Sequence, residues 1–213
     1  MKAAVGFRAH SGWAAMVVVA LEKSGPVVLW RKRPHLVKIF SYSYRQPYHT
    51  AEKMELAELR EFVAGVEKES RELAFGAIRG LQGELRKQGI ELTRCGLLLA
   101  SGRTLPSFEK ILASHALIHT ADGDHFREAI SRAAKRCGLE MATMKERELL
   151  ERAVQTLRMQ PAMLLRRITE LGKPFGAPWS QDEKFATLAA WLALHGDSKP
   201  RKYAVKDTAK HSQ

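Results

Sequence analysis

Residues 2–22 contain two apolar runs joined by a short polar break, and this pattern constrains the fold more than any other part of the chain. They read KAAVGFRAHSGWAAMVVVALE, with His10, Ser11 and Gly12 in the break. Apolar runs on either side of a short turn containing glycine are typical of an antiparallel hairpin. The second run is apolar at successive positions, which indicates a strand covered on both faces. We therefore predict a hairpin inside a sheet that has a layer packed on each side.

The rest of the chain alternates predicted strands with predicted helices. Strands are expected over residues 3–9, 13–21, 26–32, 90–102 and 139–143, and helices over 50–88, 106–119, 124–137, 145–158, 161–171 and 181–195. Residues 34–49 are expected to form a tyrosine-rich loop. Thr50 and Ser180 are the expected N-caps of the first and last helices.

Two features predict interruptions in the middle of the chain. Glycine is a poor helix former, so Gly65, Gly76, Gly80 and Gly83 predict a bend or split in the long helix. The stretch TADGD at 120–124 is expected to separate the two helices that follow the fourth strand. With 213 residues, 45% of them hydrophobic, the chain suits one α/β domain over 1–196 and a basic tail over 197–213 that has little to bury.

The charge of the chain is strongly positive and unevenly distributed. The formal net charge is +12; residues 1–50 carry 8 basic and 1 acidic residue, whereas residues 51–150 carry 16 of each. A basic excess favours polyanionic partners, nucleic acid first. The alternative is a protein that merely has a high isoelectric point.

The cysteine content and the length of the apolar runs bear on location. Cys95 and Cys137 are the two cysteines, too few for a disulfide framework, which fits a reducing cytoplasm. The run at 13–21 has nine residues, well short of the roughly 20 that span a bilayer. We expect a cytoplasmic protein that does not enter a membrane.

The predicted order of elements resembles the ribonuclease H-like superfamily, and the second half is similar to Holliday-junction resolvases of the RuvC type. The stretches that carry the resemblance are AVGFRAHSGWAAMVVV at 4–19, CGLLLASG at 95–102 and PAMLLRRITELGKPFGAPWSQDEKFATLAAWLALHG at 161–196. The resemblance implies a ribonuclease H-like mixed sheet, three antiparallel strands followed by a βαβ unit, flanked by helices.

The resemblance also implies a two-metal centre for cutting phosphodiesters. Two Mg²⁺ ions stabilise the attacking and leaving oxygens and need three or four carboxylate ligands close together. In this family one acid lies on the first strand, one at the end of the fourth, and one or two on the last helix.

This chain departs from that carboxylate pattern. Arg8 stands at the first-strand position, Leu99, Ala100 and Ser101 end the fourth strand, and Asp182 is the one candidate acid retained on the last helix. An arginine beside the site would repel Mg²⁺. The residues therefore predict a domain that binds phosphate groups but has lost most of its metal ligands. No cofactor is expected. Asp182 has a second interpretation, as a charge that complements a helix N-terminus.

The segment 30–49, WRKRPHLVKIFSYSYRQPYH, interleaves cationic and aromatic side chains. Cations can follow a phosphate backbone while aromatic rings stack on unpaired bases. The residues expected to contact phosphate are Arg8, Arg31, Lys32, Arg33 and Arg103, and the expected stacking residues are Tyr42 and Tyr44. The alternative is a strand with a solvated basic face and a loop packed on the core.

The stretch IHTADGDHF at 118–126 brings together His119, Asp122, Asp124 and His125. These are ligand types for a metal ion, and His119, Asp122, Asp124 and Asp182 are the metal candidates of the chain. The alternative is that Asp122 or Asp124 caps a helix that starts near residue 125.

Three functional hypotheses follow. The leading one is a catalytically degenerate ribonuclease H-like protein that binds nucleic acid as an accessory factor, with DNA or RNA left open. The second is a divergent Mg²⁺-dependent nuclease or phosphatase whose acids are Asp182, Glu183, Asp122 and Asp124. The third is a protein-interaction scaffold that forms a homodimer through the helix at 50–88.

Overall fold

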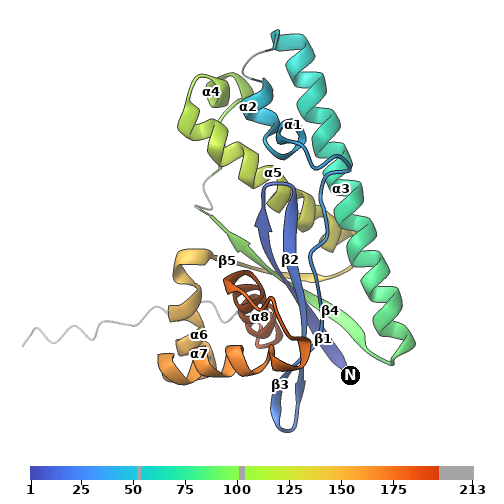
Figure 1. The fold of residues 1–213 in the computed structure, drawn as a ribbon, viewed down its shortest axis with the longest axis vertical. Coiled ribbons are helices and arrows are strands. Elements are labelled where there is room, and N and C mark those ends of the chain that lie inside the picture. The colour runs from blue at the N-terminus through green and yellow to red at the C-terminus, as the bar shows by residue number, and fades with distance from the viewer. Residues whose placement is uncertain (52–53, 101–103, 197–213) are drawn as a thin grey trace, which may run out of the picture.

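The computed structural model describes residues 1–51, 54–100 and 104–196 and is built around a five-stranded mixed sheet (Figure 1). The strands are β1 (Lys2–His10), β2 (Trp13–Glu22), β3 (Gly25–Lys32), β4 (Glu91–Leu99) and β5 (Glu140–Lys145). Their order across the sheet is β3-β2-β1-β4-β5. The pairs β1/β2 and β2/β3 are antiparallel, and β1/β4 and β4/β5 are parallel. The predicted three-strand meander followed by parallel strands is confirmed.

Helices cover both faces of this sheet (Figure 1). They are α1 (Tyr42–Arg45), α2 (Pro47–Ala51), α3 (Leu56–Lys87), α4 (Phe108–Leu112), α5 (His115–Arg136), α6 (Leu149–Leu157), α7 (Pro161–Glu170) and α8 (Gln181–Leu194), with 3₁₀ turns at Glu146–Glu148 and Lys173–Phe175. On one face, Val5 and Phe7 belong to a core with residues of α3 and α5. On the other, Ala4 and Val17 belong to a core with α6, α7 and α8.

Helix α8 lies directly on the backbone of the two central strands. A Cβ atom on Gly6 of β1 would lie 1.9 Å from the carbonyl oxygen of Ala186, and one on Gly96 of β4 would lie 2.1 Å from that of Ala189. Real side chains do not approach a backbone oxygen this closely, so both strands need glycine at the contact. The alanines of α8 complete this close packing and fix where its N-terminus lies relative to β1.

The structure corrects several predicted boundaries. The long helix does not split at its glycines but runs without interruption over Leu56–Lys87, and it starts after Glu55 rather than at Thr50, which belongs to α2. The expected loop at 34–49 contains α1 and most of α2. The stretch at 120–124 is inside α5, and the break comes earlier, at Ala113–Ser114. Tertiary burial of the helix faces outweighs the glycine propensity in both helices.

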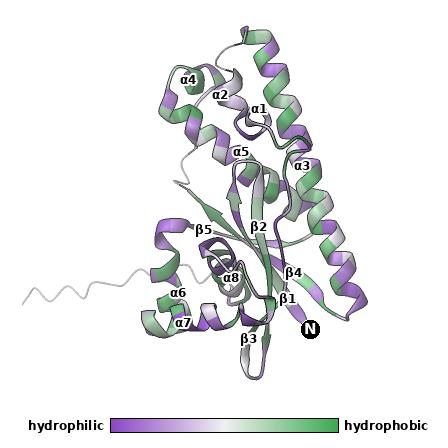
Figure 2. Cartoon of the chain, viewed as in Figure 1, coloured by the Kyte–Doolittle hydropathy of each residue, from purple (hydrophilic) through white to green (hydrophobic). Residues whose placement is uncertain are grey.

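Two further expectations concern partners and surroundings. Hydrophobic and hydrophilic residues alternate along α3 (Figure 2), and its apolar face, including Val63, Val66 and Ile78, is buried within the chain itself. A homodimer through this helix stays a prediction and would have to use its polar face.

No helix of the described ranges is both long enough and apolar enough to cross a bilayer. The predicted tail at 197–213 lies outside the described residues, so the predicted division at 196 stays a prediction.

His125 is a buried histidine of α5 without a polar partner. Its ring lies against the rings of Phe126 and Tyr48, and within the described part of the chain neither ring nitrogen has a hydrogen-bond partner. Burial, with a smaller effect of the charge on Arg71, lowers the pKa of His125 to about 3. The folded protein therefore holds this ring neutral.

We predict that replacing Gly96 with alanine lowers the free energy of unfolding by about 3 kcal/mol, because the new methyl group meets the α8 backbone. The matched control is Gly83→Ala on α3, where nothing lies within 4 Å of the added Cβ. It should stabilise the protein by up to about 1 kcal/mol through helix propensity. Urea unfolding measures both; equal effects of the two substitutions would contradict the close approach.

We also predict a pH dependence from His125. The unfolded chain takes up its proton near pH 6.5, whereas the folded chain does so only near 3. The contribution of His125 to the free energy of unfolding is therefore fully present above about pH 6.5. It is lost as the pH falls below that value, by up to about 1.4 kcal/mol per pH unit. His125→Leu should flatten the curve of unfolding free energy between about pH 6 and 4.5, above the range in which most carboxylates titrate. Parallel curves for the two proteins would contradict this assignment.

Candidate functional site

Three charged residues from distant parts of the sequence meet where β1 and β5 end and α8 begins. Arg8 lies near the end of β1, Glu146 follows β5 directly, and Asp182 lies in the first turn of α8. The parallel pairing of β1, β4 and β5 brings these strand ends to one edge of the sheet, where α/β folds commonly place their sites.

Arg8 is the centre of this cluster. Its Nε donates to Oε2 of Glu146 at 3.0 Å and its Nη2 to Oε1 of the same carboxylate at 2.6 Å, a two-pronged contact. Its Nη1 donates to Oδ1 of Asp182. The hydrogen bond and charge of Glu146, followed by those of Asp182, raise the pKa of the Arg8 guanidinium. One partly buried cation thus pairs with both carboxylates.

His10 and two aromatic rings complete the surroundings of Asp182. His10 Nε2 lies 2.7 Å from Oδ1 of Asp182, and its ring stacks on Trp13 at 4.4 Å between centroids. The Arg8 guanidinium lies 5.3 Å from the centre of the Phe185 ring. Phe185 lies three residues after Asp182 on α8, and its ring packs against the cation.

A second ion pair, between Arg33 and Glu183, lies at the N-terminus of α8. Ser180 and Glu183 form a reciprocal capping box, which confirms Ser180 as the N-cap. Arg33 Nε donates to Oε1 of the buried Glu183 at 2.6 Å. Burial acts to raise the pKa of Glu183, but the hydrogen bonds from Arg33 and Ser180 outweigh it and lower that pKa to about 2. Glu183 therefore carries its charge and has its hydrogen bonds within the protein.

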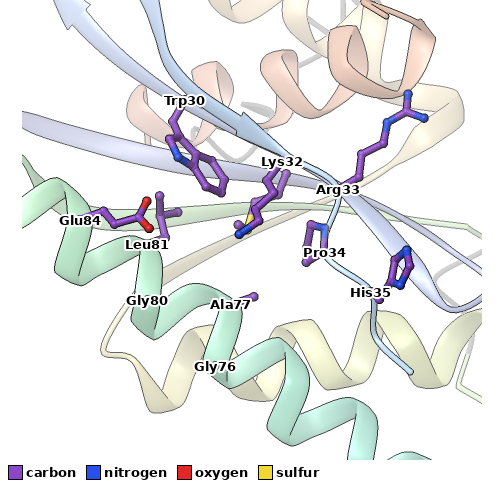
Figure 3. A pocket seen from close by; sticks show the side chains of 11 residues that line it. Trp30, Lys32, Arg33, Pro34, His35, Gly76, Ala77, Gly80, Leu81 and Glu84 are labelled. Carbon is purple, nitrogen blue, oxygen red and sulfur yellow. The ribbon is translucent and has the colours of Figure 1, made fainter. Parts of the chain in front are cut away.

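The remaining predicted phosphate ligands do not lie together. Arg31 donates hydrogen bonds to the backbone oxygens of Phe175, Ala177 and Pro178. It therefore holds the segment that connects α7 to α8. Lys32 projects on the α3 side of the sheet, where it lines a pocket of about 420 Å³ with residues including Trp30 and Glu84 (Figure 3). Arg103 lies outside the described residues. Contact of these residues with phosphate stays a prediction.

The aromatic side chains of the 34–49 segment differ in exposure. Tyr42 is 61% exposed, as a stacking residue needs to be, whereas Tyr44 packs edge-on against Phe62. Phe40, which the sequence pattern did not indicate as a stacking residue, is 46% exposed. Its ring stacks on His35 at 4.7 Å and lies 4.7 Å below the Arg45 guanidinium. Nothing in the local sequence distinguishes Phe40 from a core residue.

The predicted metal candidates are separated in the same way. Asp124 pairs with Arg127 at 2.9 Å, while Asp122 is buried and accepts from His49. Asp182 is on α8, which packs on the opposite face of the sheet from α5. The four acids of the divergent-enzyme hypothesis, which include Glu183, therefore do not converge. Instead His119 lies beside His49 and His115, two residues that were not among the metal candidates predicted from the sequence.

Structure comparison places this chain beside a known fold. Thermus thermophilus RuvC in complex with Holliday junction substrate matches over 92% of this chain and 94% of its own, with a TM-score of 0.51 and 11% identity. A second structure of Thermus thermophilus RuvC matches over 91% and 93%, with a TM-score of 0.48 and 10% identity. No protein-family model and no curated protein sequence matches. The chain has the ribonuclease H-like fold of RuvC, as its element order predicted.

We predict that Arg8→Gln lowers the free energy of unfolding by about 2 kcal/mol at pH 7, because two partly buried carboxylates lose their counterion. The control is Arg60→Gln, which removes a solvent-exposed pair with Glu109 and should have a much smaller effect, because water screens exposed ion pairs. Thermal and urea unfolding report both; an Arg8 variant as stable as the Arg60 variant contradicts the cluster's role.

Proposed function

We propose that the protein binds nucleic acid containing unpaired bases through residues 32–45, and that the Arg8 cluster leaves it without metal-dependent cleavage. The segment 32–45 is called the basic-aromatic segment below. Two kinds of support carry the proposal. One is the arrangement of charges at the sheet edge, and the other is the set of exposed rings and cations beside α3.

The observation that carries the absence of cleavage is the position of the Arg8 guanidinium. It lies between Glu146 and Asp182 and donates hydrogen bonds to both carboxylates. A pair of Mg²⁺ ions needs several free carboxylate oxygens, and a fixed cation both occupies these oxygens and repels the ions. With Glu183 held by Arg33 and Ser180, the acids at this edge already have partners within the protein.

Fold likeness and charge support nucleic acid as the partner. The matched RuvC structure is a complex with Holliday junction substrate, and this chain shares its fold at 11% identity. The net charge of +12 adds long-range attraction to phosphate. A shared fold does not by itself imply a shared function, so the exposed side chains are the main support for nucleic-acid binding.

The basic-aromatic segment offers the groups that such binding needs. Lys38 is 72% exposed at its side chain, and Lys32 is also exposed. Phe40 and Tyr42 expose their rings nearby in the chain. Ammonium groups attract the backbone without regard to sequence, whereas exposed rings bind bases only where these are unstacked. A junction or a single strand therefore fits this surface better than a continuous duplex.

The first test measures the ionic contacts. Fluorescence anisotropy with a labelled four-way DNA junction, duplex DNA and single-stranded RNA, across a salt series in EDTA, gives affinity and salt slope. The double variant Lys32→Gln/Lys38→Gln should weaken binding to all three and reduce the log–log salt slope by about 2. The control Lys23→Gln/Lys87→Gln removes the same charge from exposed positions elsewhere. Equal effects of the two double variants would overturn the surface assignment.

The second test separates stacking from charge. Phe40→Ala should weaken binding of the junction and the single strand by about 1–3 kcal/mol, leave the salt slope unchanged and spare the duplex. Uniform weakening on all three probes would contradict base stacking. Incubation of the junction with Mg²⁺ or Mn²⁺ completes the test, because protein-dependent cleavage abolished by Asp182→Asn would support the divergent enzyme instead.

A further inference from the structure

A group of three histidines lies between α2 and α5, and α5 packs on the other face of the sheet from α8. His49 comes from α2, and His115 and His119 come from the first two turns of α5. One ligand nitrogen from each ring can be chosen so that all three lie within 4.8 Å of one another. Residues four apart on a helix face the same side, which explains how α5 presents two of the rings together.

The distances between the rings suit a shared metal ion. His115 Nε2 and His119 Nε2 are 3.1 Å apart. Two Zn–N bonds of about 2.0–2.1 Å at a tetrahedral angle place their nitrogens roughly 3.3 Å apart, close to this spacing. The ring of His49 lies 4.2 Å from that of His119 and 5.1 Å from that of His115, between centroids.

A buried carboxylate orients the third ring. Asp122 is 3% exposed, and its Oδ2 accepts a hydrogen bond from Nδ1 of His49. Its other oxygen accepts from the backbone N–H of Tyr48 at 2.8 Å, which holds the carboxylate in place. A proton fixed on Nδ1 leaves the lone pair of Nε2 free, and this carboxylate–histidine pairing is typical of metal-binding histidines.

We propose that His49, His115 and His119 bind one Zn²⁺ ion, with Asp122 as the residue that positions His49. Imidazole ligands suit Zn²⁺ and exclude Mg²⁺ and Ca²⁺, which prefer oxygen. His115 and His119 are exposed and His49 is buried, so the fourth coordination position faces solvent. The ion joins α2 to α5. This inference is independent of the proposed nucleic-acid binding.

The test is titration of the purified full chain with ZnCl₂ by isothermal calorimetry, and with CoCl₂ by visible absorption. The wild type should bind one ion with micromolar or tighter affinity, and Co²⁺ should give the bands of a four-coordinate site. His119→Gln and His115→Gln, both at exposed positions, should each weaken binding by at least about 100-fold. Unchanged circular dichroism shows that these variants fold.

Two more variants make the result specific. His35→Gln removes an exposed histidine outside the group and should bind Zn²⁺ as the wild type does. Asp122→Asn should weaken binding by about 10- to 100-fold, because an amide can donate to Nδ1 and place the ring proton on Nε2. Zn²⁺ should raise the unfolding temperature of the wild type and of His35→Gln but not of His119→Gln. Absence of binding by the wild type, or equal binding by His35→Gln and His119→Gln, would overturn the proposal.

Discussion

The contact of α8 with the backbones of β1 and β4 sets the geometry on which the rest of the structure depends. Gly6 and Gly96 remove the two side chains that would hold the helix away from the sheet. The helix start then lies beside the end of β1, where Asp182 reaches Arg8 and Glu183 reaches Arg33. The charge cluster therefore follows from close packing, and a change at either glycine would move its acids away from their partners.

Charge balance at the sheet edge is the chemical consequence. A ribonuclease H-like fold gathers strand ends at this edge, and acids gathered there need compensation because burial disfavours their charged forms. Metal ions provide that compensation in a two-metal centre. In this chain a side chain of the protein provides it, since Arg8 contacts Glu146 and Asp182 together. The proposed absence of metal-dependent cleavage rests on this contact.

Sequence patterns predicted the sheet and its helical layers because these depend on strong local signals. The apolar runs at 13–21 and near Leu97, and the Ser180 cap, each indicated one element, and the order of elements indicated the fold. The predicted start of the long helix at Thr50 was wrong, and so were the interruptions predicted within α3 and α5. Burial of these helices against other elements overrides the low helix propensity of Gly76 and Gly123. Helix propensity is a weaker force than tertiary packing.

The partners of the site residues were less predictable, since they come from distant parts of the chain. Glu146 is 138 positions from Arg8, and no local pattern joins them. Likewise His115 and His119 have a helical spacing that the sequence displays, but their association with His49 depends on how α2 docks on α5. Arg31 and Lys32 are neighbours in one basic run of the sequence, but successive side chains of β3 point to opposite faces of the sheet. Arg31 therefore contacts the link before α8, whereas Lys32 lies on the α3 side. Contacts between residues that are far apart in the sequence therefore could not be predicted without the structure.

The measurement that tests the central claim most directly is paramagnetic line broadening by Mn²⁺ in the NMR spectrum, with Arg8→Asp as the comparison. The claim is that the Arg8 guanidinium takes the place of bound metal between Glu146 and Asp182. The wild type should show no site-specific broadening of the amides at 144–148 and 180–184, whereas Arg8→Asp, with three carboxylates at one point, should show it. Site-specific broadening of these amides in the wild type would contradict the account.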